Sequence, residues 1–295
     1  MRRACEGPLA RLRDRLAPPA ESPLLTLLRA DPPQAMVRAG LTPDPWQTYL
    51  LCSRADRLLV LTTRQAGKST TVAALALHTA MVRPKSLVRL LSPSERQSGE
   101  LAQKVFTYYD GLDRPVPARK RTELQLHLAN GSRVIALPES EKTIRGYSGA
   151  ALLVIDEASR VDDALYASVR PMLSVSRGRL VALFTPFGRR GWFYEAWSGP
   201  ERWERVKVTA DQCSRISPEF LAEEERALGA RWFRQEYFCS FEDAVDAVFA
   251  DGDIFAAVSG PCRRCSKECP SDDPHPRRPG GRDGPGPRPR QLGHV

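Results

Sequence analysis

Two short apolar segments of the chain each end in polar residues of a distinctive kind. Residues 58–63 (LLVLTT) lead into a glycine-lysine-serine turn at 67–69, and residues 152–155 (LLVI) lead into Asp156 and Glu157. A strand followed by such a turn supplies backbone amides and an ammonium group to phosphate oxygens. A strand that ends in two acids supplies one carboxylate for magnesium and one for an attacking water. Together the two segments predict a nucleoside triphosphatase site, which neither would predict alone.

The phosphate segment departs from the common pattern at one position. Thr62 stands where that pattern has its first glycine, whereas Gly67, Lys68 and Ser69 match it. Gly67 lets the backbone approach the phosphates, Lys68 can reach the β and γ oxygens, and Ser69 can ligate Mg²⁺ at the start of a helix. Taken alone, the segment could also be a glycine turn before a surface helix with a solvated lysine.

The two acids complete the predicted site. Both directly follow an apolar run, and open parallel sheets bind their ligands at the carboxyl ends of strands. We predict that Asp156 holds Mg²⁺, directly or through water, and that Glu157 orients and deprotonates the attacking water. A solvated pair of surface acids is the alternative interpretation.

Apolar runs alternate with helical patterns through the middle of the chain. We expect strands near residues 58–63, 87–92, 151–156, 179–185 and 203–209, and helices near residues 68–82, 94–109, 161–173, 190–197 and 218–238. An Asn-Gly pair at 130–131, between runs at 123–128 and 133–137, predicts a hairpin. The pattern indicates an α/β fold: a doubly wound, mostly parallel sheet of the P-loop NTPase type with an antiparallel hairpin addition.

Charge and hydropathy narrow the class of protein. Lys and Arg number 44 against 35 acidic residues, a formal net charge of +9, which favours a polyanionic partner although many basic proteins lack one. The sequence has no apolar run long enough for a bilayer and its start resembles no secretory signal, so we expect a soluble intracellular protein. Four scattered cysteines, without ligand or pairing spacing, are typical of a reducing compartment: Cys5, Cys52, Cys213 and Cys239.

Trp46 and Gln47 lie about ten residues before the first predicted strand. The Gln47 amide could pair with adenine because it both donates and accepts hydrogen bonds, and Trp46 could pack beside the base or in the core. The predicted nucleotide-binding residues are therefore Trp46, Gln47, Thr63, Arg64, Gln65, Ala66, Gly67, Lys68, Ser69 and Thr70.

Four segments in this order resemble the large terminase subunits of tailed bacteriophages: Trp46-Gln47, the loop at 64–69 with its leading arginine, the acidic strand at 154–158 and the Thr-Pro-Phe-Gly turn at 185–188. The resemblance covers residues 40 to about 250. It implies an ATP- and Mg²⁺-dependent motor that forms a ring at the procapsid portal in the host cytoplasm and drives double-stranded DNA inward, without reading its sequence. It also implies a portal protein and a small terminase subunit as partners.

The resemblance assigns further roles, residue by residue. Arg64 would contact the nucleotide phosphates in cis, and Arg145 would reach the site of a neighbouring subunit. Thr185, Pro186 and Gly188 would couple loss of the γ-phosphate to domain movement. A surface arginine and an ordinary strand-ending turn are the alternatives. The predicted catalytic residues are Glu157, Lys68, Arg64 and Arg145, and the predicted metal ligands are Ser69 and Asp156.

The chain departs from the family pattern after about residue 250, where large terminase subunits continue into a nuclease domain. The last 35 residues include eight Pro, seven Arg and one Lys and show no apolar period, so we expect them to be disordered. We predict an N-terminal segment over 1–39, an ATPase domain with closing helices over 40–250, and a Pro/Arg-rich tail over 251–295 in place of the nuclease. We assign no metal role to Asp251, Asp253, Asp272 or Asp273, and a zinc site at Cys262, Cys265 and Cys269 would need His275 across several prolines.

Two other functions fit part of the pattern. A DNA-stimulated ATPase of the helicase type shares the upstream glutamine and the Asp-Glu-Ala sequence, although it needs a second sheet domain after about residue 210. An inert remnant truncated from a longer protein is the other possibility. The basic run at 119–121 could contact DNA phosphates or form a solvated loop.

Overall fold

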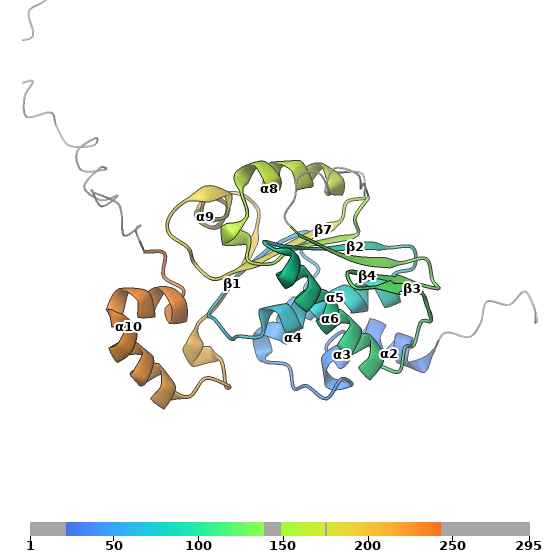
Figure 1. Cartoon of the computed structure of the whole chain (residues 1–295), viewed down its shortest axis with the longest axis horizontal. Coiled ribbons are helices and arrows are strands. Elements are labelled where there is room, and N and C mark those ends of the chain that lie inside the picture. Colours follow the sequence, from blue (N-terminus) through green and yellow to red (C-terminus); the bar gives the residue numbers. More distant parts are fainter. Residues whose placement is uncertain (1–21, 139–148, 175, 243–295) are drawn as a thin grey trace, which may run out of the picture. The chain divides into compact units, whose positions relative to one another are not determined.

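Helices cover both faces of an eight-stranded sheet in the computed structural model, which describes residues 22–138, 149–174 and 176–242 (Figure 1). The strands lie in the order β3 (Ala118–Thr122), β4 (Gln125–Leu128), β5 (Arg133–Pro138), β2 (Leu87–Ser92), β6 (Leu152–Ile155), β7 (Arg179–Phe184), β1 (Arg57–Thr62) and β8 (Glu204–Val208). All neighbouring strands from β5 to β8 are parallel, whereas β3 with β4 and β4 with β5 are antiparallel. This topology confirms the predicted mostly parallel sheet with a hairpin addition.

Each central strand is apolar on both sides because both faces of the sheet are covered. On β1, Leu58 and Val60 belong to one core, and Leu59 and Leu61 belong to the other. One face is packed by α4 (Pro45–Cys52), α5 (Lys68–Val82) and α6 (Glu95–Gly111). The other face is packed by α8 (Asp163–Val169), the 3-10 turn Arg170–Leu173 and α9 (Gly191–Ser198).

Two short helices before residue 40 share the first of these cores. Leu28 of α2 (Pro23–Ala30) and Met36 of α3 (Gln34–Val37) are buried there, and the Leu28 carbonyl oxygen lies 2.8 Å from Nε2 of His78 on α5. Residues 22–39 of the predicted N-terminal segment therefore pack as part of the sheet domain.

The predicted hairpin is confirmed, but a further strand, β3, pairs with it and was not predicted. The Asn-Gly pair at 130–131 lies between β4 and β5, as the sequence predicts. The basic run at 119–121 lies in β3, not in a loop. Every residue of β3 is exposed at the edge of the sheet, so this strand has no apolar alternation from which to predict it.

The described chain ends in one long kinked helix, α10 (Pro218–Phe238), which follows the 3-10 turn Ala210–Gln212. Ser217 caps its start by accepting a hydrogen bond from the Phe220 amide, and Gly229 breaks its helical geometry with φ 73° and ψ 156°. Within the described ranges, no helix has both the length and the hydropathy needed to cross a bilayer. The predicted tail over 251–295, with its cysteines and acids, lies outside the described residues.

Candidate active site

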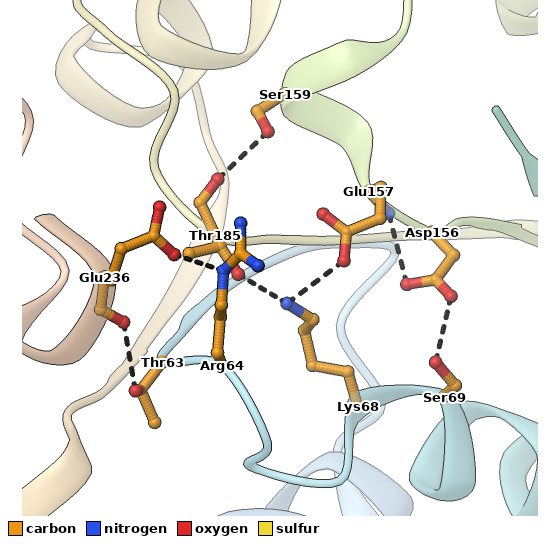
Figure 2. A network of polar contacts seen from close by, with 9 residues as sticks. All are labelled: Thr63, Arg64, Lys68, Ser69, Asp156, Glu157, Ser159, Thr185 and Glu236. Atoms are coloured by element: carbon orange, nitrogen blue, oxygen red, sulfur yellow. Dashed lines mark hydrogen bonds and ion pairs between the residues drawn. The ribbon is translucent and has the colours of Figure 1, made fainter.

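Three neighbouring strand ends form the site. The phosphate-type loop follows β1, the two acids follow β6, and Thr185 follows β7, which lies between β6 and β1 in the sheet. Because these strands are parallel, their carboxyl ends meet at one edge, where open α/β sheets bind ligands. Predicted site residues that lie far apart along the chain are thus brought together (Figure 2).

Left-handed backbone geometry shapes the loop between β1 and α5. Gln65 has φ 60° and Gly67, the N-cap of α5, has φ 88°. Lys68 and Ser69 therefore occupy the first turn of α5, whose amides at the helix start have no partner within the helix and favour an anion.

The Lys68 ammonium is the central charge of the site. Its Nζ donates a hydrogen bond to Thr185 Oγ1 at 2.6 Å and lies 3.4 Å from Glu157 Oε1, as Figure 2 shows. The side chain is 9% exposed, so the charge is held by these two groups and not by bulk water.

Ser69 and Asp156 present hard oxygen ligands beside this ammonium. Ser69 Oγ donates to Asp156 Oδ2 at 3.1 Å, and the Glu157 amide donates to Asp156 Oδ1 at 3.1 Å. Burial, followed by the neighbouring Glu157 charge, raises the pKa of Asp156 above its ordinary value, and Lys68 and Ser69 partly oppose this shift. A hydroxyl and a carboxylate suit Mg²⁺, which usually takes few protein ligands together with substrate phosphates. Within the described ranges, no group of three or more His, Cys, Asp or Glu side chains could form a separate metal cage.

Arg64 is held by the last turn of α10. Its guanidinium forms an ion pair with the Glu236 carboxylate, and Thr63 Oγ1 donates to the Glu236 carbonyl oxygen at 3.0 Å (Figure 2). Only Nε of Arg64 pairs with Glu236, and Arg64 also lines the cleft described below, so its other guanidinium nitrogens are placed for the predicted contact with phosphate.

The loop, Glu157 and the turn after β7 line one cleft of about 600 Å³, and Asp156 lies behind its lining, bonded to Ser69. Residues to which the sequence motifs give no role also line it: Pro93, Gln97, Lys104, Arg160, Phe187 and Glu236. Gln97 and Lys104 are seven residues apart on α6, so they lie on one helix face. This spacing is the sequence signal from which their shared orientation could have been predicted. The lining carries Arg64, Lys68, Lys104 and Arg160 against Glu157 and Glu236, a balance that favours a polyanionic ligand.

Thr185 and Pro186, two of the predicted coupling residues, lie in this lining, and the Thr185 carbonyl oxygen accepts a hydrogen bond of 3.0 Å from Ser159 Oγ. Gly188 follows with φ 72°. Arg145, the arginine predicted to act on a neighbouring subunit, lies outside the described residues.

Trp46 and Gln47 do not line the cleft. Trp46 is packed in the core, and the Gln47 side chain is 1% exposed behind the loop. Gln47 Oε1 accepts from the Asp44 amide at 2.8 Å, and its Nε2 donates to Thr71 Oγ1 at 3.0 Å. In the structure both ends of this amide are bonded inside the protein, whereas the sequence suggested that it could pair with adenine.

A parallel sheet, a phosphate-type loop at the start of a helix and an acidic strand end define the P-loop class of nucleotide-binding domains. The family model for the N-terminal part of the T4likevirus-type large terminase subunit matches residues 59–256. The chain belongs to this family, which confirms the resemblance seen in the sequence.

Individual relatives agree with this assignment. The chain is 27% identical over 175 residues to the large terminase subunit of Thermus virus P23-45, covering 53% of this chain and 36% of that protein. It therefore spans about a third of that relative's length. The large terminase ATPase domain of Thermus phage P74-26 superposes with a TM-score of 0.61 at 20% identity, over 70% of this chain and 97% of that one. The large terminase of bacteriophage D6E in complex with ADP gives 0.56 at 13% identity, over 67% of this chain and 53% of that one.

The raised pKa of Asp156 predicts that this carboxylate destabilises the nucleotide-free protein. The folded state holds the proton to higher pH than the unfolded chain, so the free energy of unfolding falls as pH rises through the folded-state pKa. An Asp156→Asn variant should therefore melt at a higher temperature than the parent at pH 7, with a smaller difference at lower pH.

Melting curves at several pH values measure this difference, with Asp211→Asn as an exposed control that should not change. A lower melting temperature for Asp156→Asn at pH 7 would show that the charged carboxylate stabilises the fold instead.

Proposed function

We propose that this chain is the ATP-hydrolysing part of a motor that moves double-stranded DNA into a viral capsid. The observation that carries the proposal is the convergence of Lys68, Ser69 and Glu157 at one cleft, with Asp156 bonded to Ser69, in a chain of the large terminase family. The ADP and ATP-gamma-S complexes of the D6E large terminase support ATP as the ligand.

Each residue has a separate task in hydrolysis. Lys68 would bind the β- and γ-phosphate oxygens, and Ser69 and Asp156 would hold Mg²⁺, which would offset negative charge on the phosphates. When the phosphates take Lys68, its contact with Glu157 is lost. The freed carboxylate can then orient a water molecule and accept its proton as the water attacks the γ-phosphorus. The bond from the γ-phosphorus to the bridging oxygen breaks, and ADP and inorganic phosphate leave.

Two arginines contact the phosphate that is transferred. Arg64 contacts phosphate oxygens in its own subunit, and Arg145 reaches the site of the next subunit in a ring. Thr185, Pro186 and Gly188 respond to loss of the γ-phosphate, because Thr185 shares the Lys68 ammonium with that group.

DNA, the portal protein and the small terminase subunit are the proposed partners, met in the host cytoplasm at the procapsid portal. The DNA contact is to phosphates and does not depend on base sequence. Arg119 and Lys120 of β3 are a candidate grip because they stand exposed on one edge of the sheet, whereas the neighbouring Arg121 pairs with Asp110.

Replacing the proposed base should separate binding from turnover. Glu157→Gln should bind ATP with Mg²⁺ but hydrolyse it about 10²- to 10⁴-fold more slowly, because the amide cannot accept the proton. Lys68→Ala should lose most of the binding itself. Nucleotide titration and phosphate release measure the two steps, with Glu100→Gln on the exposed side of α6 as a control. Parent-like hydrolysis by Glu157→Gln would remove the proposed role.

Double-stranded DNA should stimulate hydrolysis, and stimulation should weaken as salt rises because phosphate contacts release counterions. An Arg119→Ala and Lys120→Ala double variant should need more DNA for half-maximal stimulation while its basal rate stays unchanged. Arg226→Ala with Arg231→Ala removes the same charge from α10 as a control. Separation of duplex strands by the purified protein would instead favour a helicase-type ATPase.

Mixing two inactive variants tests the action of Arg145 between subunits. An Arg145→Ala subunit keeps its own Glu157, and a Glu157→Gln neighbour still carries Arg145. Where the two are adjacent, the site of the Arg145→Ala subunit can therefore contain both residues. The mixture should therefore recover part of the ATPase rate that each variant lacks alone. If the mixture stays as inactive as the separate variants, Arg145 does not act on a neighbour.

A further inference from the structure

Three segments far apart in the sequence meet behind the phosphate loop. Arg215 lies between the 3-10 turn Ala210–Gln212 and α10, and its Nη2 donates to Asp44 Oδ2 at 2.7 Å and to the Ala66 carbonyl oxygen at 2.8 Å. Asp44 is the N-cap of α4 and is 8% exposed, and Ser214 Oγ donates to its other oxygen at 3.4 Å. Arg215 is thus fixed by an anchored carboxylate and holds one peptide group of the loop.

This contact sets the direction of a loop amide. In a trans peptide the carbonyl oxygen of one residue and the N–H of the next point in opposite directions. Ala66 and Gly67 line the cleft, whereas Arg215 does not. Because Arg215 holds the Ala66 carbonyl oxygen on its own side of the loop, the Gly67 N–H is turned away from Arg215, toward the side on which phosphate would bind.

The next peptide of the loop is fixed in the same way. The Gly67 carbonyl oxygen accepts from the Thr71 amide at 3.0 Å and from Thr71 Oγ1 at 2.9 Å. Thr71 Oγ1 in turn accepts from Gln47, whose own oxygen accepts from the Asp44 amide. One chain of hydrogen bonds therefore connects the start of α4 to the loop.

The loop also packs tightly on these side chains. A Cβ atom at Gly67 would lie 2.9 Å from Gln47 Nε2 and 3.3 Å from Arg215 Nη2. Glycine at this position therefore serves the contact behind the loop as well as the positive φ.

We propose that Arg215, anchored by Asp44, is a positioning residue that keeps the loop amides directed at phosphate. The inference rests on the proposed triphosphate site but adds a residue that touches neither nucleotide nor metal. Without Arg215, the peptide between Ala66 and Gly67 can rotate, and its carbonyl oxygen then faces the anionic phosphates.

Two other roles could make Arg215 matter, and each has its own signature. If the guanidinium contacts the base, its loss weakens ATP but not a ligand without a base. If it acts only as a positive charge, then Asp44→Asn, which makes the surroundings more positive, should tighten phosphate binding. Positioning predicts the reverse, because Asp44→Asn loosens the anchor of Arg215.

The test measures binding of tripolyphosphate and of ATP, each with Mg²⁺, to the whole chain by titration calorimetry. Arg215→Ala should weaken both ligands about tenfold, as expected for one lost charge-assisted contact. Asp44→Asn should weaken both by a smaller factor, and adding it to Arg215→Ala should have little further effect because the two residues act through one contact. Arg226→Ala, which removes an arginine from α10, should bind like the parent.

Steady-state rates give a second readout. Arg215→Ala should raise KM for ATP about tenfold with a smaller change in kcat, and Arg215→Lys should restore part of the affinity. If Arg215→Ala does not fold, Asp44→Asn alone decides between positioning and simple charge by the direction of its effect.

Unchanged tripolyphosphate binding in Arg215→Ala, or tighter binding in Asp44→Asn, would overturn the positioning role while leaving the proposed ATPase intact. If the parent binds neither ligand, the proposed function fails and this inference fails with it.

Discussion

A buried ammonium group governs the arrangement of this protein's site. Lys68 lies at the start of a helix that is packed into the core, so its charge has to be met by groups that the sheet delivers to it. Those groups are Glu157 after β6 and Thr185 after β7. They can meet Lys68 only because β6, β7 and β1 are adjacent and parallel, and so the sheet order and the chemistry of the cleft are one constraint.

The sequence predicted those secondary-structure elements and site residues that are marked by patterns within a short stretch of chain. Apolar periodicity located β1, β2, β6, β7 and the helices between them, and the motifs located Lys68, Ser69, Asp156 and Glu157. The exposed strand β3 was missed because its residues carry no burial pattern. The sequence suggested that Gln47 could pair with adenine, yet its amide is used behind the loop, a choice that only the packed structure reveals.

Contacts across long sequence separations explain the remaining misses. The pairing of Arg64 with Glu236 joins residues 172 apart, and that of Arg215 with Asp44 joins residues 171 apart. No spacing rule connects such positions. These two contacts hold opposite ends of the phosphate loop from residues near the start and end of α10. A ligand that displaces Arg64 from Glu236 therefore acts directly on this helix.

A crystal structure of the protein with Mg²⁺ and a non-hydrolysable ATP analogue would show whether the triphosphate binds at Lys68. We expect β- and γ-phosphate oxygens at Lys68, with the metal held by Ser69 and Asp156 and with Glu157 released from Lys68 toward a water molecule. A nucleotide bound outside this cleft, or a Lys68–Glu157 contact that persists with the analogue bound, would contradict this expectation.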